Sequence, residues 1–172
     1  MFSNTITRTN MSAVYMSGGK GTSIEENNIS NNYAGITVAH AREITLARNI
    51  IRENSDYYGA VSLTNLTNVQ IVNNVIGNNR EGIDATQVRN SRFEGNNLSK
   101  NYAGIYLVAS SNNTLINNNA NSNIWSGIVL SSSSNNTLIN NNANLNYYAG
   151  IYLFYSSNNT LTNNTANLNY YA

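Results

Sequence analysis

The chain has no cysteine and no proline among its 172 residues. Without cysteine it can form neither disulfides nor thiolate metal sites. Without proline its backbone can form uninterrupted ladders of hydrogen bonds, because proline has no N–H to donate to one. No apolar run approaches the ~20 residues of a membrane span. The first ten residues lack the apolar core of a secretory signal. We therefore expect no membrane insertion.

Charged residues are also scarce, at 10% of the chain with a net charge of +1. All nine Lys and Arg and all eight Asp and Glu lie at or before Lys100. A balance this close to neutral predicts no nucleic-acid partner. The length suits one domain. We expect a single domain over residues 1–172, with divergent charged repeats in 1–100 and near-identical uncharged repeats in 101–172.

What the sequence does contain is a repeat of 22 to 25 residues. The segments Gly104–Leu107, Gly127–Leu130 and Gly150–Leu153 each lead into Asn-Asn-Thr-Leu, which begins at residues 112, 135 and 158. With Gly104 as position 0 of a repeat, the same position is held by the residues Gly82, Ala60, Gly35 and Ala13 toward the N-terminus. A fixed period of this length indicates a repeat architecture.

Apolar residues recur at positions 1, 3 and 11 of each repeat, and the residues between them tend to be polar. This alternation is typical of short strands with one buried face. The repeat is too short for a strand and a packed helix. The sequence therefore predicts an all-β fold, a parallel β-helix of about seven coils of 22–25 residues. Right-handed winding is expected because parallel crossovers take that hand.

Asparagine recurs at two further positions. Position 19 is occupied by Asn10, Asn32, Asn54, Asn79, Asn101, Asn123, Asn146 and Asn169. Position 14 is occupied by Asn27, Asn49, Asn74, Asn96, Asn118, Asn141 and Asn164, with Thr5 in the first repeat. Asparagine tolerates the left-handed conformation of sharp corners, and stacked amides can bond along the axis of the rod. We predict that these residues form structural ladders.

The repeated Gly-Ile-x-Leu and Asn-x-Thr-Leu-x-x-Asn units resemble the right-handed parallel β-helix repeats of the NosD-like family. That family is similar to a wider group of β-helical carbohydrate-binding proteins and sugar hydrolases. The resemblance covers almost the whole chain and is clearest from Asn101 onward. It implies a β-helix fold and an extracellular or cell-surface location.

For enzymes on this scaffold the resemblance implies clustered acids with a His, Lys or Arg, often with calcium. The candidates are Glu25, Glu26, Glu43, Glu53, Asp56, Glu81, Asp84 and Glu94, with His40 as the one imidazole. The repeat register places Asp84 on the outer face, next to Thr37 and Tyr106. It pairs no two acids on adjacent coils. We therefore expect no catalytic residues and no enzyme. His40, Met11 and Met16 are too few for a copper site, and no metal or cofactor is expected.

Aromatic residues are concentrated near position 20 and on the adjoining outward strand. They are Tyr33, Tyr57, Tyr58, Tyr102, Trp125, Tyr147, Tyr148, Tyr170 and Tyr171, followed by Tyr15, Tyr106, Tyr152 and Phe154. Rings spaced by ~4.8 Å along an uncharged face could stack on the sugars of a neutral polysaccharide. The candidate glycan-binding residues are Tyr102, Tyr106, Trp125, Tyr148, Tyr152 and Phe154. The alternative is that these rings only shield the asparagine ladder.

Three functions remain open at this point. The favoured hypothesis is a non-catalytic structural or adhesive repeat segment of a surface or extracellular protein, self-associating end to end through uncapped coils. The second is a carbohydrate-binding module that uses the outward tyrosines. The third is a fragment of a polysaccharide lyase, hydrolase or epimerase.

Overall fold

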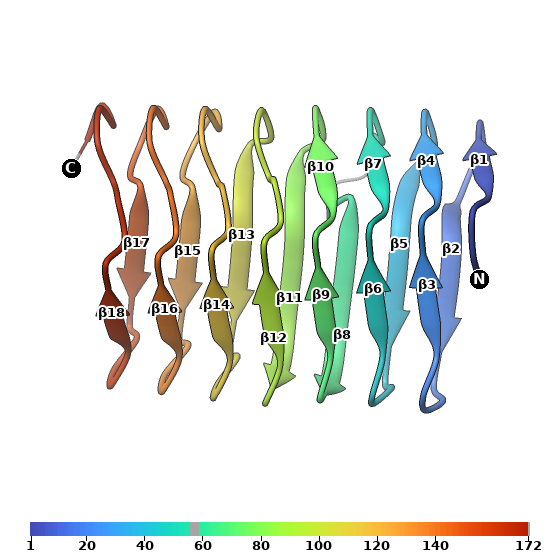
Figure 1. Ribbon diagram of the computed structural model, residues 1–172, viewed down its shortest axis with the longest axis horizontal. Coiled ribbons are helices and arrows are strands. Elements are labelled where there is room, and N and C mark those ends of the chain that lie inside the picture. Colours follow the sequence, from blue (N-terminus) through green and yellow to red (C-terminus); the bar gives the residue numbers. More distant parts are fainter. Residues whose placement is uncertain (56–58, 172) are drawn as a thin grey trace.

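The computed structural model shows a parallel β-helix in which each coil lies beside the next along one axis (Figure 1). It describes residues 1–55 and 59–171. Every strand pair within these residues is parallel, and two of the three sheets have seven strands, one for each coil. The predicted fold of about seven coils is confirmed. The described residues contain no helix long and apolar enough to cross a membrane.

Three sheets form the walls of the rod. The first consists of β2 (Ser12–Ser17), β5 (Ala34–Ala39), β8 (Val61–Thr67), β11 (Glu81–Arg89), β13 (Ala103–Val108), β15 (Ile128–Ser131) and β17 (Ile151–Phe154). The second consists of β3 (Ser23–Glu25), β6 (Thr45–Ala47), β9 (Gln70–Val72), β12 (Arg92–Glu94), β14 (Thr114–Ile116), β16 (Thr137–Ile139) and β18 (Thr160–Thr162). The third consists of β1 (Thr5–Thr7), β4 (Asn28–Ser30), β7 (Ile50–Arg52) and β10 (Val75–Gly77).

The third sheet changes character halfway along the rod. Beyond β10 it continues only as isolated parallel bridges, which join Val75 to Asn97, Asn97 to Asn119, Asn119 to Asn142, and Asn142 to Thr165. The inward residue of this wall also changes, from Ile76 and Leu98 to Ala120 and Ala143. Alanine and asparagine are weak strand formers. The weak strand propensity explains why this wall has no continuous strands beyond β10. The parallel bridges show that its coils nevertheless stay in register.

The core is a set of aliphatic columns that run the length of the rod. One column of the first sheet consists of Val14, Ile36, Val61, Ile83, Ile105, Ile128 and Ile151. The facing column of the second sheet consists of Ile24, Leu46, Ile71, Phe93, Leu115, Leu138 and Leu161. In the interior coils these side chains are buried. Burying each one contributes roughly 1.5–3 kcal/mol relative to leaving it in water.

The two predicted asparagine ladders are confirmed. The backbone N and the Nδ2 of Asn79 donate to Oδ1 of Asn101, at 3.1 and 3.2 Å. Asn101 in turn donates from its backbone N to Oδ1 of Asn123 at 2.9 Å, and from Nδ2 to the carbonyl of Ile76 at 3.0 Å. The column continues through Asn32 and Asn54 on one side and through Asn146 on the other. Asn118 and Asn141 repeat the pattern in the second column.

The first rung of each ladder differs from the prediction. Thr9, not Asn10, donates its backbone N to Oδ1 of Asn32, at 3.0 Å. In the other column Asn4, not Thr5, donates to Oδ1 of Asn27, at 3.1 Å. The first coil is therefore 23 residues from the second, whereas the sequence register assumed 22. This one-residue offset removes Asn10 from the ladder.

The ladder asparagines are not the residues with left-handed backbone, contrary to the expectation from the sequence. Positive φ falls on the residue just before each rung, such as Lys100 (φ 63°), Asn117 (φ 54°) and Leu145 (φ 58°). The corner is made by that preceding residue, which turns the chain so that the next side chain points inward. The amide of the rung then satisfies buried backbone groups, and this explains why asparagine is needed there.

Two shorter ladders were not predicted from the sequence. One runs from Ser91 through Asn113 and Asn136 to Asn159, with the backbone N of Asn113 donating to Oδ1 of Asn136 at 3.0 Å. The other is made of hydroxyls, and Ser110 N donates to Oγ of Ser133 at 3.0 Å. Both have the 22- or 23-residue spacing of the asparagine ladders, so the same periodicity could have identified them.

Position 0 must be small because coils approach closely there. A Cβ added to Gly104 would lie 2.5 Å from the carbonyl oxygen of Gly127 and 2.9 Å from Cβ of Ala120. Backbone atoms cannot move away from such a contact at low cost. The glycines at this position therefore let neighbouring coils pack against each other.

Candidate functional site

The outer face of the first sheet carries one continuous column of polar and aromatic side chains. In strand register it consists of Tyr15, Thr37, Ser62, Asp84, Tyr106, Val129 and Tyr152. Asp84 lies between Ser62 and Tyr106, so the expected neighbour Thr37 is one coil further away. The coil that contains Ala60 and Ser62 separates Thr37 from Asp84. The candidate site lies along this column.

Two carboxyl side chains meet on this face at the start of β11. Glu81 is the first residue of the strand and is only 8% exposed, whereas Asp84 is half-buried on the outer face. A Cβ added to Gly59 would lie 3.2 Å from Cβ of Glu81 and 3.4 Å from Cβ of Asp84. Both acids therefore flank Gly59, whose φ of 124° is a backbone conformation that only glycine adopts readily. We call Glu81 and Asp84 the acid pair.

Burial raises the pKa values of both carboxyls in the acid pair above their ordinary values. The pKa of Glu81 is raised to about 7, because burial and the charge of Asp84 outweigh the opposing effects of Arg80 and of a backbone hydrogen bond from Ala103. Burial also raises the pKa of Asp84 to about 6, against the effect of a hydrogen bond from Thr86. Near neutral pH Glu81 is then about half protonated and Asp84 mostly ionised. Two carboxyls with separated pKa values can serve as a proton donor and a proton acceptor.

One carboxyl oxygen of the pair has no hydrogen-bond partner among the described residues. Oε2 of Glu81 is buried and accepts no hydrogen bond from the part of the chain that the structure describes. Buried polar atoms normally have hydrogen-bond partners, so this oxygen needs an explanation, and a catalytic role is one. Three further candidates from the sequence, Asp56, Tyr57 and Tyr58, lie outside the described residues.

The acid pair was not predicted from the sequence because only acids on adjacent coils were considered. The two residues instead belong to one coil and stand three positions apart, where the strand begins and Glu81 and Gly82 are both buried. The sequence did contain a signal for this site at position −1 of the repeat, the residue just before position 0. The residues there are Ser12, Ala34, Gly59, Glu81, Ala103, Ser126 and Ala149. Glu81 is the one large and charged residue in this column, so it distinguishes its coil from the others.

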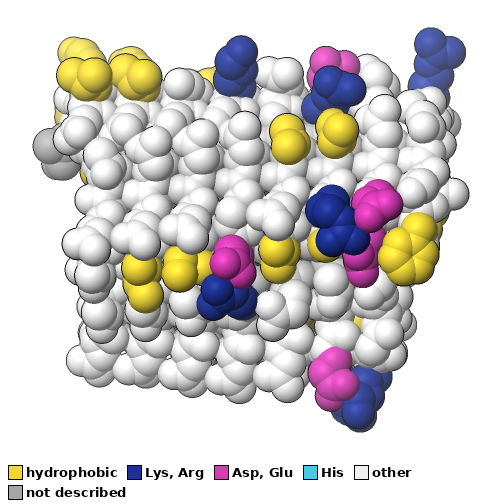
Figure 2. Space-filling view, viewed as in Figure 1, with side chains coloured by type: hydrophobic (Ala, Val, Ile, Leu, Met, Phe, Trp, Pro, Cys, Tyr) yellow, Lys and Arg dark blue, Asp and Glu magenta, His cyan; other side chains and the backbone are white. Residues whose placement is uncertain are grey.

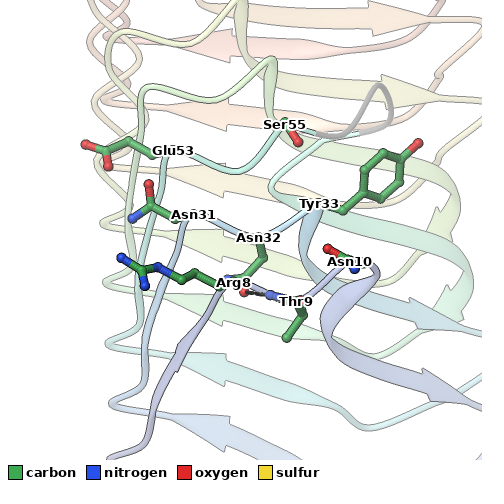
Figure 3. A pocket seen from close by; sticks show the side chains of 8 residues that line it. All are labelled: Arg8, Thr9, Asn10, Asn31, Asn32, Tyr33, Glu53 and Ser55. Atoms are coloured by element: carbon green, nitrogen blue, oxygen red, sulfur yellow. Dashed lines mark hydrogen bonds between the residues drawn. The ribbon is translucent and has the colours of Figure 1, made fainter.

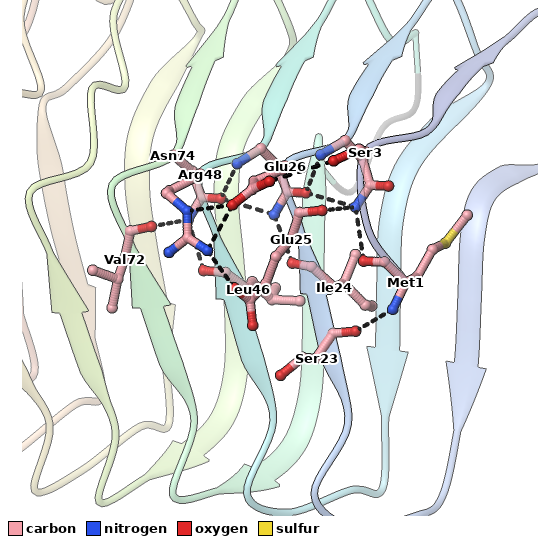
Figure 4. Close-up of polar contacts among 12 residues, drawn as sticks. Met1, Ser3, Ser23, Ile24, Glu25, Glu26, Leu46, Arg48, Val72 and Asn74 are labelled. Atoms are coloured by element: carbon pink, nitrogen blue, oxygen red, sulfur yellow. Dashed lines mark hydrogen bonds and ion pairs between the residues drawn. The ribbon is translucent and has the colours of Figure 1, made fainter.

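Several of the other candidate acids are neutralised by cations. Figure 4 shows Arg48 reaching across from its coil to Glu25 and Glu26, with N–O distances of 2.6 and 2.9 Å. Glu94 pairs with Arg92 at 2.6 Å, and Glu43 pairs with Lys20 at 3.4 Å. His40 lies at a corner with φ 54° and shares a hydrogen bond with Asn65. Such exposed pairs contribute little to stability, and they leave the acid pair as the candidate for chemistry.

The described residues include no group of three or more His, Asp or Glu side chains placed to hold a metal ion. Among residues 1–55 and 59–171, neither member of the acid pair belongs to such a group. The two carboxyls of the acid pair can themselves donate and accept a proton.

The six candidate glycan residues form one connected cluster, which we call the aromatic platform: Tyr102, Tyr106, Trp125, Tyr148, Tyr152 and Phe154. Trp125 stacks between Tyr102 and Tyr148, with centroid distances of 5.7 and 6.1 Å and interplanar angles of 23° and 26°. Tyr106 and Tyr152 contact Trp125 edge-on, at 81° and 73°. Phe154 continues the cluster at 6.3 Å from Tyr152. The role of the aromatic platform in binding a glycan stays a prediction.

Of the remaining aromatic candidates that the structure describes, Tyr171 adjoins the platform, with its ring centroid 5.4 Å from that of Tyr148, and the others lie elsewhere. Tyr147 and Tyr170 stack on each other at 5.4 Å. Tyr15 and Tyr33 line a hollow of about 260 Å³ on the other side of the acid pair, and this hollow reaches Ser62. Tyr33 also borders a more polar cavity of about 600 Å³, where Figure 3 shows the side chains of Arg8 and Glu53 on the side away from Tyr33. The outer face thus has hollows before the acid pair and the aromatic platform after it.

Comparison with solved structures shows the same fold in polysaccharide-modifying enzymes. A mutant of the periplasmic alginate epimerase AlgG matches with a TM-score of 0.78 and 24% identity, over 83% of this chain and 35% of its own. A double mutant of AlgG matches with a TM-score of 0.71 and 16% identity, over 95% of this chain and 46% of its own.

The A-module of the mannuronan C-5 epimerase AlgE6 from Azotobacter vinelandii has a TM-score of 0.69 and 15% identity, over 93% of this chain and 56% of its own. The chain thus spans between about a third and just over half of the length of these proteins. No curated protein matches it in sequence.

These comparisons contradict the expectation that the chain is not an enzyme. The solved proteins that share its fold are epimerases, and the structure brings together an acid pair that was not predicted from the sequence. At these levels of identity the similarity itself establishes the fold and not a particular reaction. The prediction that the chain has no catalytic residues considered acids on neighbouring coils alone, and it stays a prediction.

The sequence also matches a protein family over its whole length. The family is described as the right handed beta helix region, and it matches residues 1–120 and 82–172. Its handedness agrees with the winding that the sequence predicts. The chain belongs to the right-handed β-helix family.

Proposed function

We propose that this chain is the β-helical part of a polysaccharide-modifying enzyme. A sugar polymer lies along the outer face of the first sheet, and Glu81 and Asp84 exchange protons with it. The observation that carries the proposal is the convergence of the acid pair on Gly59, with pKa values of about 7 and about 6. This combination of burial and neighbouring like charge is typical of acid–base sites.

The roles follow from the two pKa values. Glu81, with the higher value, is the proton donor at neutral pH, and Asp84, with the lower value, is the acceptor. Hydrolysis, elimination and epimerisation of a polysaccharide all require a proton to be moved at one sugar. Hydrolysis by two carboxyls needs one of them protonated and the other ionised. The acid pair supplies both states at the same pH.

The related solved structures support a polysaccharide as the substrate class, since they are alginate and mannuronan epimerases. AlgG is moreover a periplasmic protein. We propose by analogy that this chain acts outside the cytoplasm, in keeping with the extracellular or surface location that the NosD-like repeats imply. Membership of that subgroup and end-to-end self-association stay predictions.

The test is turnover of a panel of polymers by the full chain. The panel contains polymannuronate, polygalacturonate, mannan and a β-1,4-glucan, assayed for new reducing ends, for unsaturated products and for epimerised residues by NMR. Glu81→Gln and Asp84→Asn should each lower the rate at least 100-fold, because removing a general acid or base costs roughly 10²–10⁴ in rate. Circular dichroism should remain that of the unsubstituted chain.

Glu94→Gln is the matched control, since Glu94 lies on the second sheet and pairs with Arg92. It should leave the rate within about twofold. Equal rates for all three variants, or no turnover of any polymer by the unsubstituted chain, would contradict the proposal.

A further inference from the structure

We infer that the polymer is uncharged where it crosses the aromatic platform, so that the substrate is a neutral glycan and not a polyuronate. This inference rests on the proposed function for the path of the polymer. It adds the class of sugar and the residues that bind it. It also separates this chain from the alginate and mannuronan epimerases that share its fold.

The rings of the platform divide into two groups by orientation. Tyr102, Trp125 and Tyr148 stack on one another from coil to coil, so neighbouring rings cover the faces of Trp125. Tyr106 and Tyr152 stand nearly perpendicular to Trp125, on the outer face of the first sheet. The stacked rings therefore support the platform. Tyr106 and Tyr152 are the two platform tyrosines in the outward column of the first sheet, and we expect them to be the rings that contact a ligand.

The spacing of these two rings suits an extended glycan. Tyr106 and Tyr152 are two coils apart in register, or roughly 10 Å at the usual strand spacing. Val129 separates them in the column and is 1% exposed. Trp125 contacts both rings, with centroid distances of 6.1 Å to Tyr106 and 6.2 Å to Tyr152. In an extended β-1,4-linked glycan alternate sugars present the same face. Each second sugar can therefore stack on one of the two tyrosines.

The charge distribution selects a neutral polymer. No Lys, Arg, Asp or Glu follows Lys100, and the platform lies entirely beyond that residue. Figure 2 shows the other side of the rod, formed by the second and third sheets, and there too charged side chains lie over the N-terminal and middle coils and none over the last coils. A polyuronate carries one negative charge per sugar and would find no cation on the platform. At its near edge it would also meet the carboxyl of Asp84, which lies beside Tyr106.

Affinity gel electrophoresis of the full chain tests this inference, with mannan or a soluble β-1,4-glucan in one gel and polymannuronate in another. We expect a neutral polymer to retard the chain and polymannuronate to leave its mobility unchanged. The double variant Tyr106→Ala/Tyr152→Ala should weaken binding at least tenfold. Tyr147→Ala is the matched control, because Tyr147 is 62% exposed and stacks on Tyr170 away from these two rings.

Retardation by polymannuronate alone, or equal binding by the double variant and Tyr147→Ala, would overturn the inference. Circular dichroism and thermal melting of each variant show whether weaker binding reflects unfolding. The acid variants separate the two proposals, because Glu81→Gln should abolish turnover and leave binding to the platform unchanged. Binding without turnover in the unsubstituted chain would refute the enzymatic proposal alone.

Discussion

Tyr106 on β13 lies directly opposite Asp84 on β11, at neighbouring positions of the outward column of the first sheet. This pairing joins the two features of the outer face, since Tyr106 is the first ring of the aromatic platform and Asp84 belongs to the acid pair. A polymer that stacks on Tyr106 would place its next sugar beside the carboxyls. The proposed binding site and the proposed acid–base site are thus one coil apart.

The acid pair should make the folded protein less stable as the pH rises. In the native state Glu81 and Asp84 hold their protons up to pKa values of about 7 and about 6, from ordinary values of 4.5 and 3.8. Between those limits the folded chain binds more protons than the unfolded chain. The free energy of unfolding therefore falls as the pH rises from about 4 to about 7. Urea unfolding at pH 4.5, 6 and 7.5 measures this loss.

Glu81→Gln and Asp84→Asn should each flatten that dependence, by on the order of 1 kcal/mol over the window for a partly solvated group. Glu94→Gln is the control of opposite sign. Arg92 lowers the pKa of Glu94, so the stabilisation from this pair is present above the ordinary pKa and lost as the pH falls. An unchanged pH dependence in both acid variants would show that the pair is not buried as described.

The asparagine ladder should contribute more to stability than an asparagine at the surface. Asn118 accepts hydrogen bonds from the backbone N and Nδ2 of Asn96, and its own Nδ2 donates to the carbonyl of Phe93. Asn118→Ala should cost about 1–3 kcal/mol, because it leaves buried groups unpaired. Asn10→Ala, outside the ladder in the structure, should stay within about 0.5 kcal/mol. Chemical denaturation compares the two, and equal costs would contradict the assigned register.

Leu145 offers a stabilising substitution. It has a φ of 58° and is 56% exposed, a backbone conformation that is costly for a leucine. Asparagine holds the same corner at Asn31 and Asn78. Leu145→Asn should therefore raise the free energy of unfolding by about 0.5–1 kcal/mol. Ile124→Asn is the control, since Ile124 is similarly exposed but has no positive φ. A gain from both substitutions, or from neither, would rule out backbone strain as the cause.

Most of the fold could be predicted from the sequence because every coil repeats the same chemical requirements. The core columns and the rungs at Asn101 and Asn118 recur at one phase, so the period alone predicts which residues stack. The errors occurred where the period changes. At the first coil a one-residue offset placed Asn4 and Thr9 in the columns. At the corners the strain falls on the residue before each asparagine, which periodicity cannot distinguish from the rung itself.

The candidate site was harder to predict because it departs from the repeat. Glu81 occupies a position where other coils have a small residue, and its burial depends on Gly59, 22 residues earlier in the chain. Neither the raised pKa of Glu81 nor its approach to Asp84 follows from spacing, since both depend on how far each side chain is removed from water. The aromatic platform was predicted more completely because its rings recur with the coil.

The outward column contains one residue from each coil, so the chain can gain or lose whole coils without disturbing the others. Each coil of a solenoid contacts only the coils on either side of it, and the acid pair lies on a single coil. Duplicating the unit that contains Tyr147 to Asn169 would add rings to the platform, while Glu81 and Asp84 would keep the same immediate neighbours. The length of the platform and the surroundings of the acid pair could therefore evolve separately.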